Sequence, residues 1–196
     1  MDATKRENLL LLAEAMAQEL SDYLLGDSLY RQLIVKTPQG VKQPKMSLGA
    51  LLEHLEALTA AEAEMTPDQR QRLRAVQEQV TLARRSFAEQ WRAKLRRELH
   101  GLLSSWRWYL EDAAQNVKAR QNYPTEVSTR TRLALLLEAL GNEPEVADDR
   151  RELAQLDRRL QAMFQRGAYI GPREEQARYP ADRAWWLYGR LKDTDE

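Results

Sequence analysis

Apolar residues recur at spacings of three and four over most of this chain, which is the period of an amphipathic helix. The first such stretch covers residues 3–25 and ends at Gly26, and a second begins at Ser47, whose hydroxyl can cap it. A third begins at Thr66 and Pro67, because a hydroxyl cap followed by proline in the first turn favours helix initiation. Most of the chain is therefore predicted to be helical.

The third stretch is the main feature of the pattern. Its apolar stripe runs from Leu73 to Val117 with an average spacing of about 3.67 residues, which fits a straight helix better than a heptad repeat. The phase persists across Gly101, so we expect one continuous central helix over residues 67–119. At on the order of 80 Å it would be longer than a compact globule of this size is wide. The protein is then elongated, or a second copy covers the overhang, or the helix breaks near Gly101.

The remaining pattern predicts smaller elements. One helix ends at Gly141, and a fifth long helix ends at Arg166 and Gly167, where a cation and a glycine both suit a helix C-terminus. A short final helix is expected around residues 184–191. Residues 29–45 contain a β-branched run and a Thr-Pro-Gln-Gly turn, so a short hairpin or an ordered loop is expected there.

These elements define the predicted fold class. We expect an all-α protein, an elongated helical bundle of five major helices plus a short C-terminal helix around one long central helix, with the minor hairpin or loop at residues 29–45. One domain covering residues 1–196 is the expectation from length. The alternative is two sub-bundles, about 1–100 and 101–196, which share the central helix.

Composition excludes several classes of protein. The chain has no cysteine, so disulfides, thiolate nucleophiles and zinc–thiolate sites are absent. No stretch approaches the roughly 20 apolar residues that cross a bilayer. Glu14 and Glu19 interrupt the first apolar run, which therefore predicts a helix rather than a signal peptide. We expect a cytoplasmic protein without a membrane partner.

Motifs for cofactor or metal chemistry are missing. Neither GxGxxG nor GxxxxGK[ST] occurs, and the two histidines, His54 and His100, lack a glutamate three residues earlier, as a helical di-iron site requires. HExxH and Gly-x-Ser-x-Gly are also absent. We expect no cofactor and no bound metal.

The net charge is zero, from 30 basic and 30 acidic side chains, but the charges are unevenly distributed. Residues 67–132 carry 14 basic and 7 acidic groups, whereas residues 1–66 carry 6 and 10 and residues 133–196 carry 10 and 13. The simplest interpretation is that acidic flanking helices pair with a basic central helix. The alternative is a basic surface for nucleic acid, with Arg92 and Arg96 on one face of the central helix as candidate contacts.

Aromatic residues gather near the end of the central helix and again close to the C-terminus. They form either a core, in which the C-terminal segment packs back on the central helix, or a groove that binds a partner, since Trp, Tyr and Arg dominate interaction hot spots. The candidate binding residues of such a groove are Trp108, Tyr123, Trp185, Trp186 and Arg190.

The expected role is a non-enzymatic interaction, adaptor or regulatory protein, whose partner is another protein or a second copy in a homodimer. Nucleic-acid binding through the basic central helix is the first alternative. An enzyme whose carboxylate or arginine chemistry matches no motif is the second, and a deep pocket with convergent polar groups would favour it.

Overall fold

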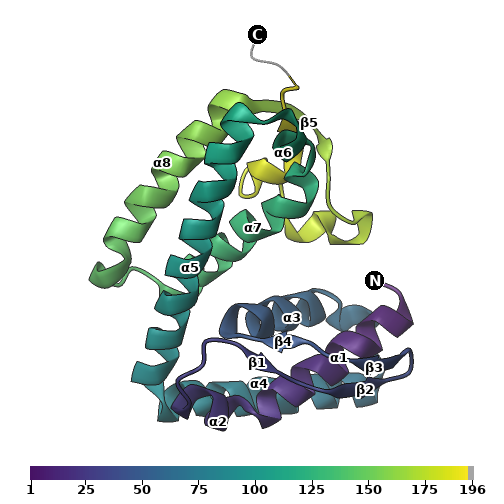
Figure 1. The fold of residues 1–196 in the computed structure, drawn as a ribbon. Helices are drawn as coiled ribbons and strands as arrows, with labels where there is room; N and C mark the ends of the chain where they lie inside the picture. Colours follow the sequence, from purple (N-terminus) through teal and green to yellow (C-terminus); the bar gives the residue numbers. More distant parts are fainter. Residues whose placement is uncertain (194–196) are drawn as a thin grey trace. The chain divides into compact units, whose positions relative to one another are not determined.

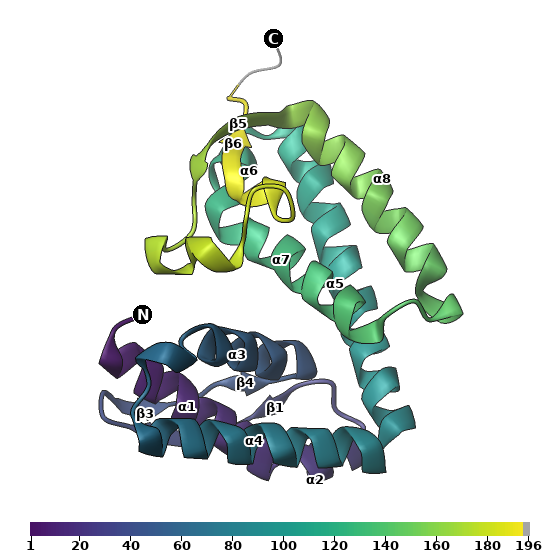
Figure 2. The same cartoon turned by 180° about the vertical axis from the view of Figure 1, so that it is seen from behind.

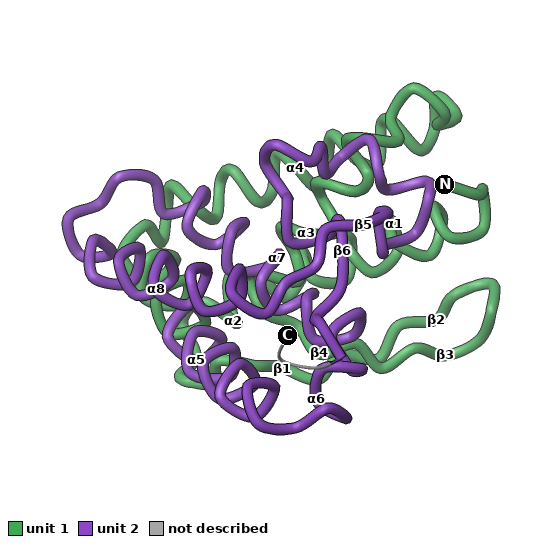
Figure 3. The backbone as a smooth tube through the Cα atoms, turned by 90° about the horizontal axis from the view of Figure 1, so that it is seen from above, with its two compact units in different colours: residues 1–98 green, residues 99–196 purple. Residues whose placement is uncertain are grey.

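The computed structural model describes residues 1–193, and most of them lie in helices (Figure 1). The chain divides into two compact units, residues 1–98 and 99–196 (Figure 3). Helix α5, Ala88–Gln115, begins in the first unit and ends in the second. Among the described residues, no helix is long and apolar enough to cross a membrane.

Unit 1 combines helices with a short β-ribbon. Helix α1 lies against both α3 and α4 (Figure 2), and the ribbon forms where a hairpin or loop was expected. In the ribbon β1 pairs with β4 and β2 pairs with β3, all antiparallel. The bounds of the elements are α1 Ala3–Gln18, α2 Leu20–Leu25, β1 Arg31–Gln32, β2 Val35–Thr37, β3 Gly40–Lys42, β4 Lys45–Met46, α3 Leu48–Ala60, η1 Glu62–Glu64 and α4 Pro67–Ser86.

Helix α4 begins where the cap signal predicted. The Thr66 hydroxyl accepts a hydrogen bond from the Gln69 amide at 3.2 Å, and the Gln69 side chain accepts one from the Thr66 amide at 3.2 Å. This reciprocal pair is a capping box, which satisfies two amides that the helix itself leaves unpaired.

The expectation of one continuous helix over residues 67–119 was wrong. Phe87 leaves the helical conformation, with φ −125° and ψ 45°, and separates α4 from α5. Asn116 is extended and caps a separate short helix by accepting from the Lys118 amide. At Gly101, in contrast, α5 is unbroken. The spacing of apolar residues does not indicate the break at Phe87. Ala83 and Trp91, on either side of it, are both buried and continue the helical period without interruption.

Two charged side chains on α5 tie unit 1 together. The fully buried Glu98 carboxylate accepts from the Ser47 hydroxyl at 2.7 Å and from the Gly49 amide at 2.9 Å, so it lies at the start of α3. The buried Lys94 ammonium donates to the carbonyls of Gly26 at 2.6 Å and Ser28 at 2.5 Å. Burial lowers the pKa of Lys94, with a further decrease from the nearby Arg97 charge.

Unit 2 consists of the rest of α5, three further helices, short 3₁₀ turns and one pair of strands. Strand β5 pairs with β6 antiparallel, and the register shifts between Arg166 and Tyr169. The bounds are α6 Val117–Gln121, α7 Tyr123–Leu140, η2 Pro144–Val146, α8 Ala147–Met163, β5 Phe164–Tyr169, η3 Arg173–Arg178, η4 Trp185–Leu187 and β6 Tyr188–Leu191.

The two predictions for the end of the chain were wrong. Helix α8 stops at Met163 instead of reaching Arg166, and residues 184–191 form only a short 3₁₀ turn before β6. At residues 164–166 and 188–191 the chain pairs as β5 and β6 instead of forming helix. Such pairing depends on residues far apart in the sequence, so the local apolar pattern does not predict it. The pairing requires glycine at position 189, because a Cβ there would lie 2.2 Å from the Gln165 carbonyl oxygen.

A cluster of aromatic and arginine side chains joins α7 to η4 and α8. The Tyr123 hydroxyl donates to the Trp186 carbonyl at 2.6 Å, and both side chains are buried. The Arg130 guanidinium lies 3.8 Å from the Trp186 ring centroid and forms two 2.7 Å hydrogen bonds with Asp157. A paired cation stacked on an indole gives this core fixed geometry as well as buried area.

We predict that Glu98→Ala destabilises the protein by about 3 kcal/mol, because it leaves buried donors of Ser47 and Gly49 without an acceptor. Urea-induced unfolding followed by circular dichroism measures the change. The matched control is Glu89→Ala, whose exposed carboxylate pairs only across a solvated helix surface and should change stability by less than about 0.5 kcal/mol. Equal effects of the two substitutions would contradict the role assigned to Glu98.

Candidate functional site

Two tryptophans on α5 lie in opposite environments. Trp106 is 0% exposed and stacks on Tyr109, with 5.2 Å between the ring centroids, whereas Trp108 is 70% exposed. Residues two apart on a helix point to nearly opposite sides, since each residue turns the helix by about 100°. Burial of Trp106 in the core of unit 2 therefore places Trp108 in solvent.

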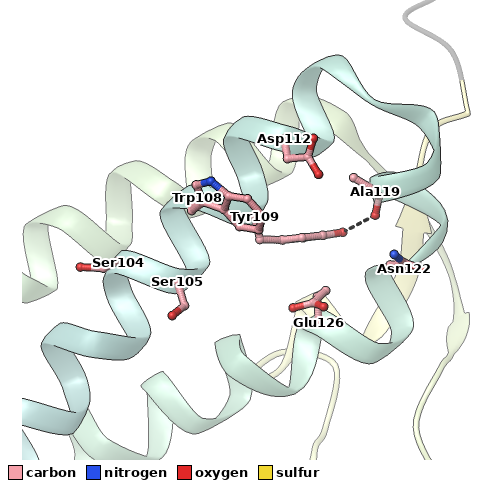
Figure 4. A pocket seen from close by; sticks show the side chains of 8 residues that line it. All are labelled: Ser104, Ser105, Trp108, Tyr109, Asp112, Ala119, Asn122 and Glu126. Carbon is pink, nitrogen blue, oxygen red and sulfur yellow. Dashed lines mark hydrogen bonds between the residues drawn. The ribbon is translucent and has the colours of Figure 1, made fainter.

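Trp108 lies at an open pocket of about 640 Å³ within unit 2 (Figure 4). This volume is inside the range of roughly 300–1,000 Å³ that is usual for ligand pockets. We call it the Trp108 pocket. Its lining residues come from α5, α6, α7 and the residue between the last two, and they are Ser104, Ser105, Trp108, Tyr109, Asp112, Ala119, Asn122 and Glu126.

Tyr109 forms the inner wall of the pocket. Its side chain is nearly buried, and its hydroxyl donates to the Ala119 carbonyl at 3.2 Å, which connects α5 to α6 (Figure 4). Burial raises the pKa of Tyr109 well above its ordinary value, and the negative charges of Glu126 and Asp112 raise it further. The tyrosine therefore stays a neutral donor.

The two carboxylates of the pocket have no cationic partner among residues 1–193. Asp112 lies on α5 and Glu126 on α7, and Figure 4 shows both near the Tyr109 side chain. Within residues 1–193, Asp112 accepts only a 3.4 Å hydrogen bond from the Asn116 amide group, and Glu126 forms no hydrogen bond or ion pair. Carboxylates without a counter-charge next to an exposed indole form a surface complementary to a cation.

The pocket contains one of the candidate binding residues predicted from sequence, Trp108. Tyr123 and Trp186 are buried, and Trp185 is half-buried against Phe164, with 5.4 Å between ring centroids. These three rings are engaged in the core of unit 2. Of the three, only Trp185 keeps part of its side chain exposed.

The candidate arginines lie elsewhere. Arg190 is exposed on β6, beside a smaller hollow of about 350 Å³ along the β5–β6 pair. Arg92 and Arg96 belong to unit 1, where Arg92 forms an ion pair with Glu89 at 2.7 Å and Arg96 is half-buried. None of the three arginines lines the Trp108 pocket.

Sequence reasoning missed the carboxylates of the pocket. Trp108 and Asp112 are four residues apart on one helix, so their adjacency follows from helical spacing alone. Glu126 lies on α7, and it reaches the pocket only because α6 reverses the chain direction between α5 and α7. That reversal depends on the break at Asn116, which the expected continuous helix did not include.

The two histidines of the chain lie outside the Trp108 pocket. In the described part of the chain, no group of three or more His, Cys, Asp or Glu residues is arranged to hold a metal ion. His54 contacts the Ala50 carbonyl and His100 contacts the Asp149 carboxylate, and neither histidine lines the Trp108 pocket.

We predict that Trp108→Ala changes the free energy of unfolding by less than about 0.5 kcal/mol, because the exposed ring buries little area. Trp106→Ala is the contrasting substitution, and its cavity should cost about 3–5 kcal/mol. Thermal and urea unfolding of the two variants measure the difference. A large loss of stability in Trp108→Ala would show that the ring is structural.

Comparison with known proteins gives no further guide. No family model matches this sequence, and no curated protein or solved structure matches the chain. Function is therefore argued from the geometry and charge of the pocket, since a fold by itself does not assign an activity.

Proposed function

We propose that this chain is a non-enzymatic protein-interaction protein, and that the Trp108 pocket binds a cationic side chain on an extended segment of a partner. The observation that carries the proposal is the combination of a 70% exposed indole with the Asp112 and Glu126 carboxylates, neither of which has a cation partner in the described chain. An indole face and two carboxylates together favour a lysine or arginine over a neutral group.

The composition of the pocket supports a protein partner over nucleic acid. Two unpaired carboxylates repel phosphate groups, and the pocket lining contains no lysine or arginine. Serine hydroxyls from Ser104 and Ser105 and the Asn122 amide add hydrogen-bonding groups that suit a peptide backbone. The volume of about 640 Å³ has room for a side chain and part of the segment that carries it.

The proposal is tested with the labelled peptide acetyl-Leu-Arg-Leu-Arg-Leu-amide and a neutral analogue in which citrulline replaces both arginines. We expect the arginine peptide to bind at least tenfold more tightly in fluorescence polarisation, because citrulline keeps the shape and removes the charge. Trp108→Ala should weaken binding of the arginine peptide by about fivefold, and Asp112→Asn with Glu126→Gln by about tenfold.

The matched control is Glu138→Gln, an exposed carboxylate on α7 that does not line the pocket, and it should leave the affinity unchanged. Equal binding of the arginine and citrulline peptides would contradict the proposal. Unchanged affinity in the Trp108→Ala variant would also contradict it, because it would place the peptide elsewhere.

A further inference from the structure

The β-ribbon of unit 1 has one buried face and one exposed face. Successive residues of an extended segment point to opposite sides, and this alternation continues between β1 and β2: Leu33 and Val35 are each 7% exposed, while Ile34 is 76% exposed. Met46, which pairs with Arg31, is fully buried, so the inner face packs into unit 1. The outer face packs against nothing within the described part of unit 1.

The outer face, which we call the ribbon face, is both apolar and cationic. Ile34 is 76% exposed and Val41 is 59% exposed, and Lys36 pairs directly with Val41 across β2 and β3. Residues 29–46 contain four basic side chains and no acidic one. The outward positions are Tyr30, Gln32, Ile34, Lys36, Val41, Gln43 and Lys45.

Lys36 is the free cation of this face. Its ammonium forms no hydrogen bond or ion pair with any residue in the range 1–193. Lys45, in contrast, lies 4.3 Å from the centroid of the Tyr30 ring, and Arg31 pairs with Glu19 at 2.7 Å. The ribbon face therefore presents one uncommitted ammonium between two exposed aliphatic side chains, Ile34 and Val41.

The arginines at the beginning of α5 are a less suitable counterpart for an acidic pocket. Arg92 already forms an ion pair with Glu89, and the Arg97 guanidinium donates to the Asp27 carbonyl at 2.8 Å. Docking through these groups would require existing contacts to break. Docking through Lys36 would not.

We propose that the partner segment is the ribbon face of a second copy of this chain, with Lys36 entering the Trp108 pocket. The inference rests on the proposed function of that pocket. The ammonium lies against the Trp108 ring and between the Asp112 and Glu126 carboxylates, and Ile34 and Val41 cover the apolar surface of the indole. The Lys36 ammonium of one chain thereby meets the two pocket carboxylates of another, which have no cationic partner among residues 1–193.

Such a contact joins two different surfaces, one pocket and one ribbon face. Copies can therefore associate reciprocally, in a two-fold dimer that makes the contact twice, or head to tail through a heterologous interface. This property gives the proposal a specific test, because a copy with a disabled pocket and a copy with a disabled ribbon can still form one intact contact together.

The test uses the full chain and two double variants. The pocket variant carries Trp108→Ala with Glu126→Lys, and the ribbon variant carries Ile34→Ser with Lys36→Glu, all at exposed or half-buried positions. Sedimentation equilibrium in 50 mM NaCl measures association, and circular dichroism verifies folding. The matched control is Arg158→Glu, which makes the same charge change as Lys36→Glu at an exposed site on α8.

We expect the unmodified chain and the Arg158→Glu variant to associate alike. Each double variant alone should have a dissociation constant at least about tenfold higher, and their equimolar mixture should recover a one-to-one complex. Raising NaCl to 500 mM should weaken the association, because these charges are exposed.

A monomeric unmodified chain at 100 µM in 50 mM NaCl would overturn the inference, and so would a mixture no more associated than its separate components. These outcomes do not depend on the peptide experiment. Binding of the arginine peptide by a monomeric chain would support the proposed function and contradict self-association through the ribbon face. A chain that neither binds the peptide nor self-associates would contradict both proposals.

Discussion

The burial of one face of α5 within unit 2 is the constraint on which the candidate site depends. In this unit the buried face of the helix contains Leu99, Leu103 and Trp106. These contacts in the core of unit 2 fix the rotation of this part of the helix about its own axis. Side chains on the other face are then exposed by geometry, and Trp108 is the largest of these apolar side chains.

The sequence predicted the helical class, because period and capping chemistry are local. Thr66 with Gln69 at the start of α4 and Gly141 at the end of α7 are signals within a few residues of the feature they mark. The bend at Phe87 and the β5–β6 pairing depend on contacts between distant residues. The Trp108 pocket depends on both local spacing and a contact between separate helices. Trp108 and Asp112 share one face of α5, whereas Glu126 lines the pocket because the chain reverses direction after Asn116.

The magnitudes of these interactions indicate that one cation alone would be a weak ligand for the proposed site. A partly solvated cation–indole contact contributes about 0.5–2 kcal/mol, and each exposed ion pair adds up to about 1 kcal/mol. A dissociation constant of 1 mM already corresponds to about 4 kcal/mol of binding free energy. Stable association therefore needs apolar contacts beside the cation, and a segment with aliphatic neighbours such as Ile34 and Val41 supplies them.

The rotation of α5 exposes Trp108 and buries Trp106, and we propose that Trp108 is therefore the ring that meets a partner. The most direct measurement is ¹H–¹⁵N NMR of the five tryptophan indole groups during titration with an arginine-containing peptide. We expect a progressive shift of the Trp108 indole signal, assigned from the Trp108→Ala variant, while the signal of the buried Trp106 stays unchanged. Equal shifts of all indole signals, or a shift of other signals without that of Trp108, would show that the peptide does not bind at Trp108.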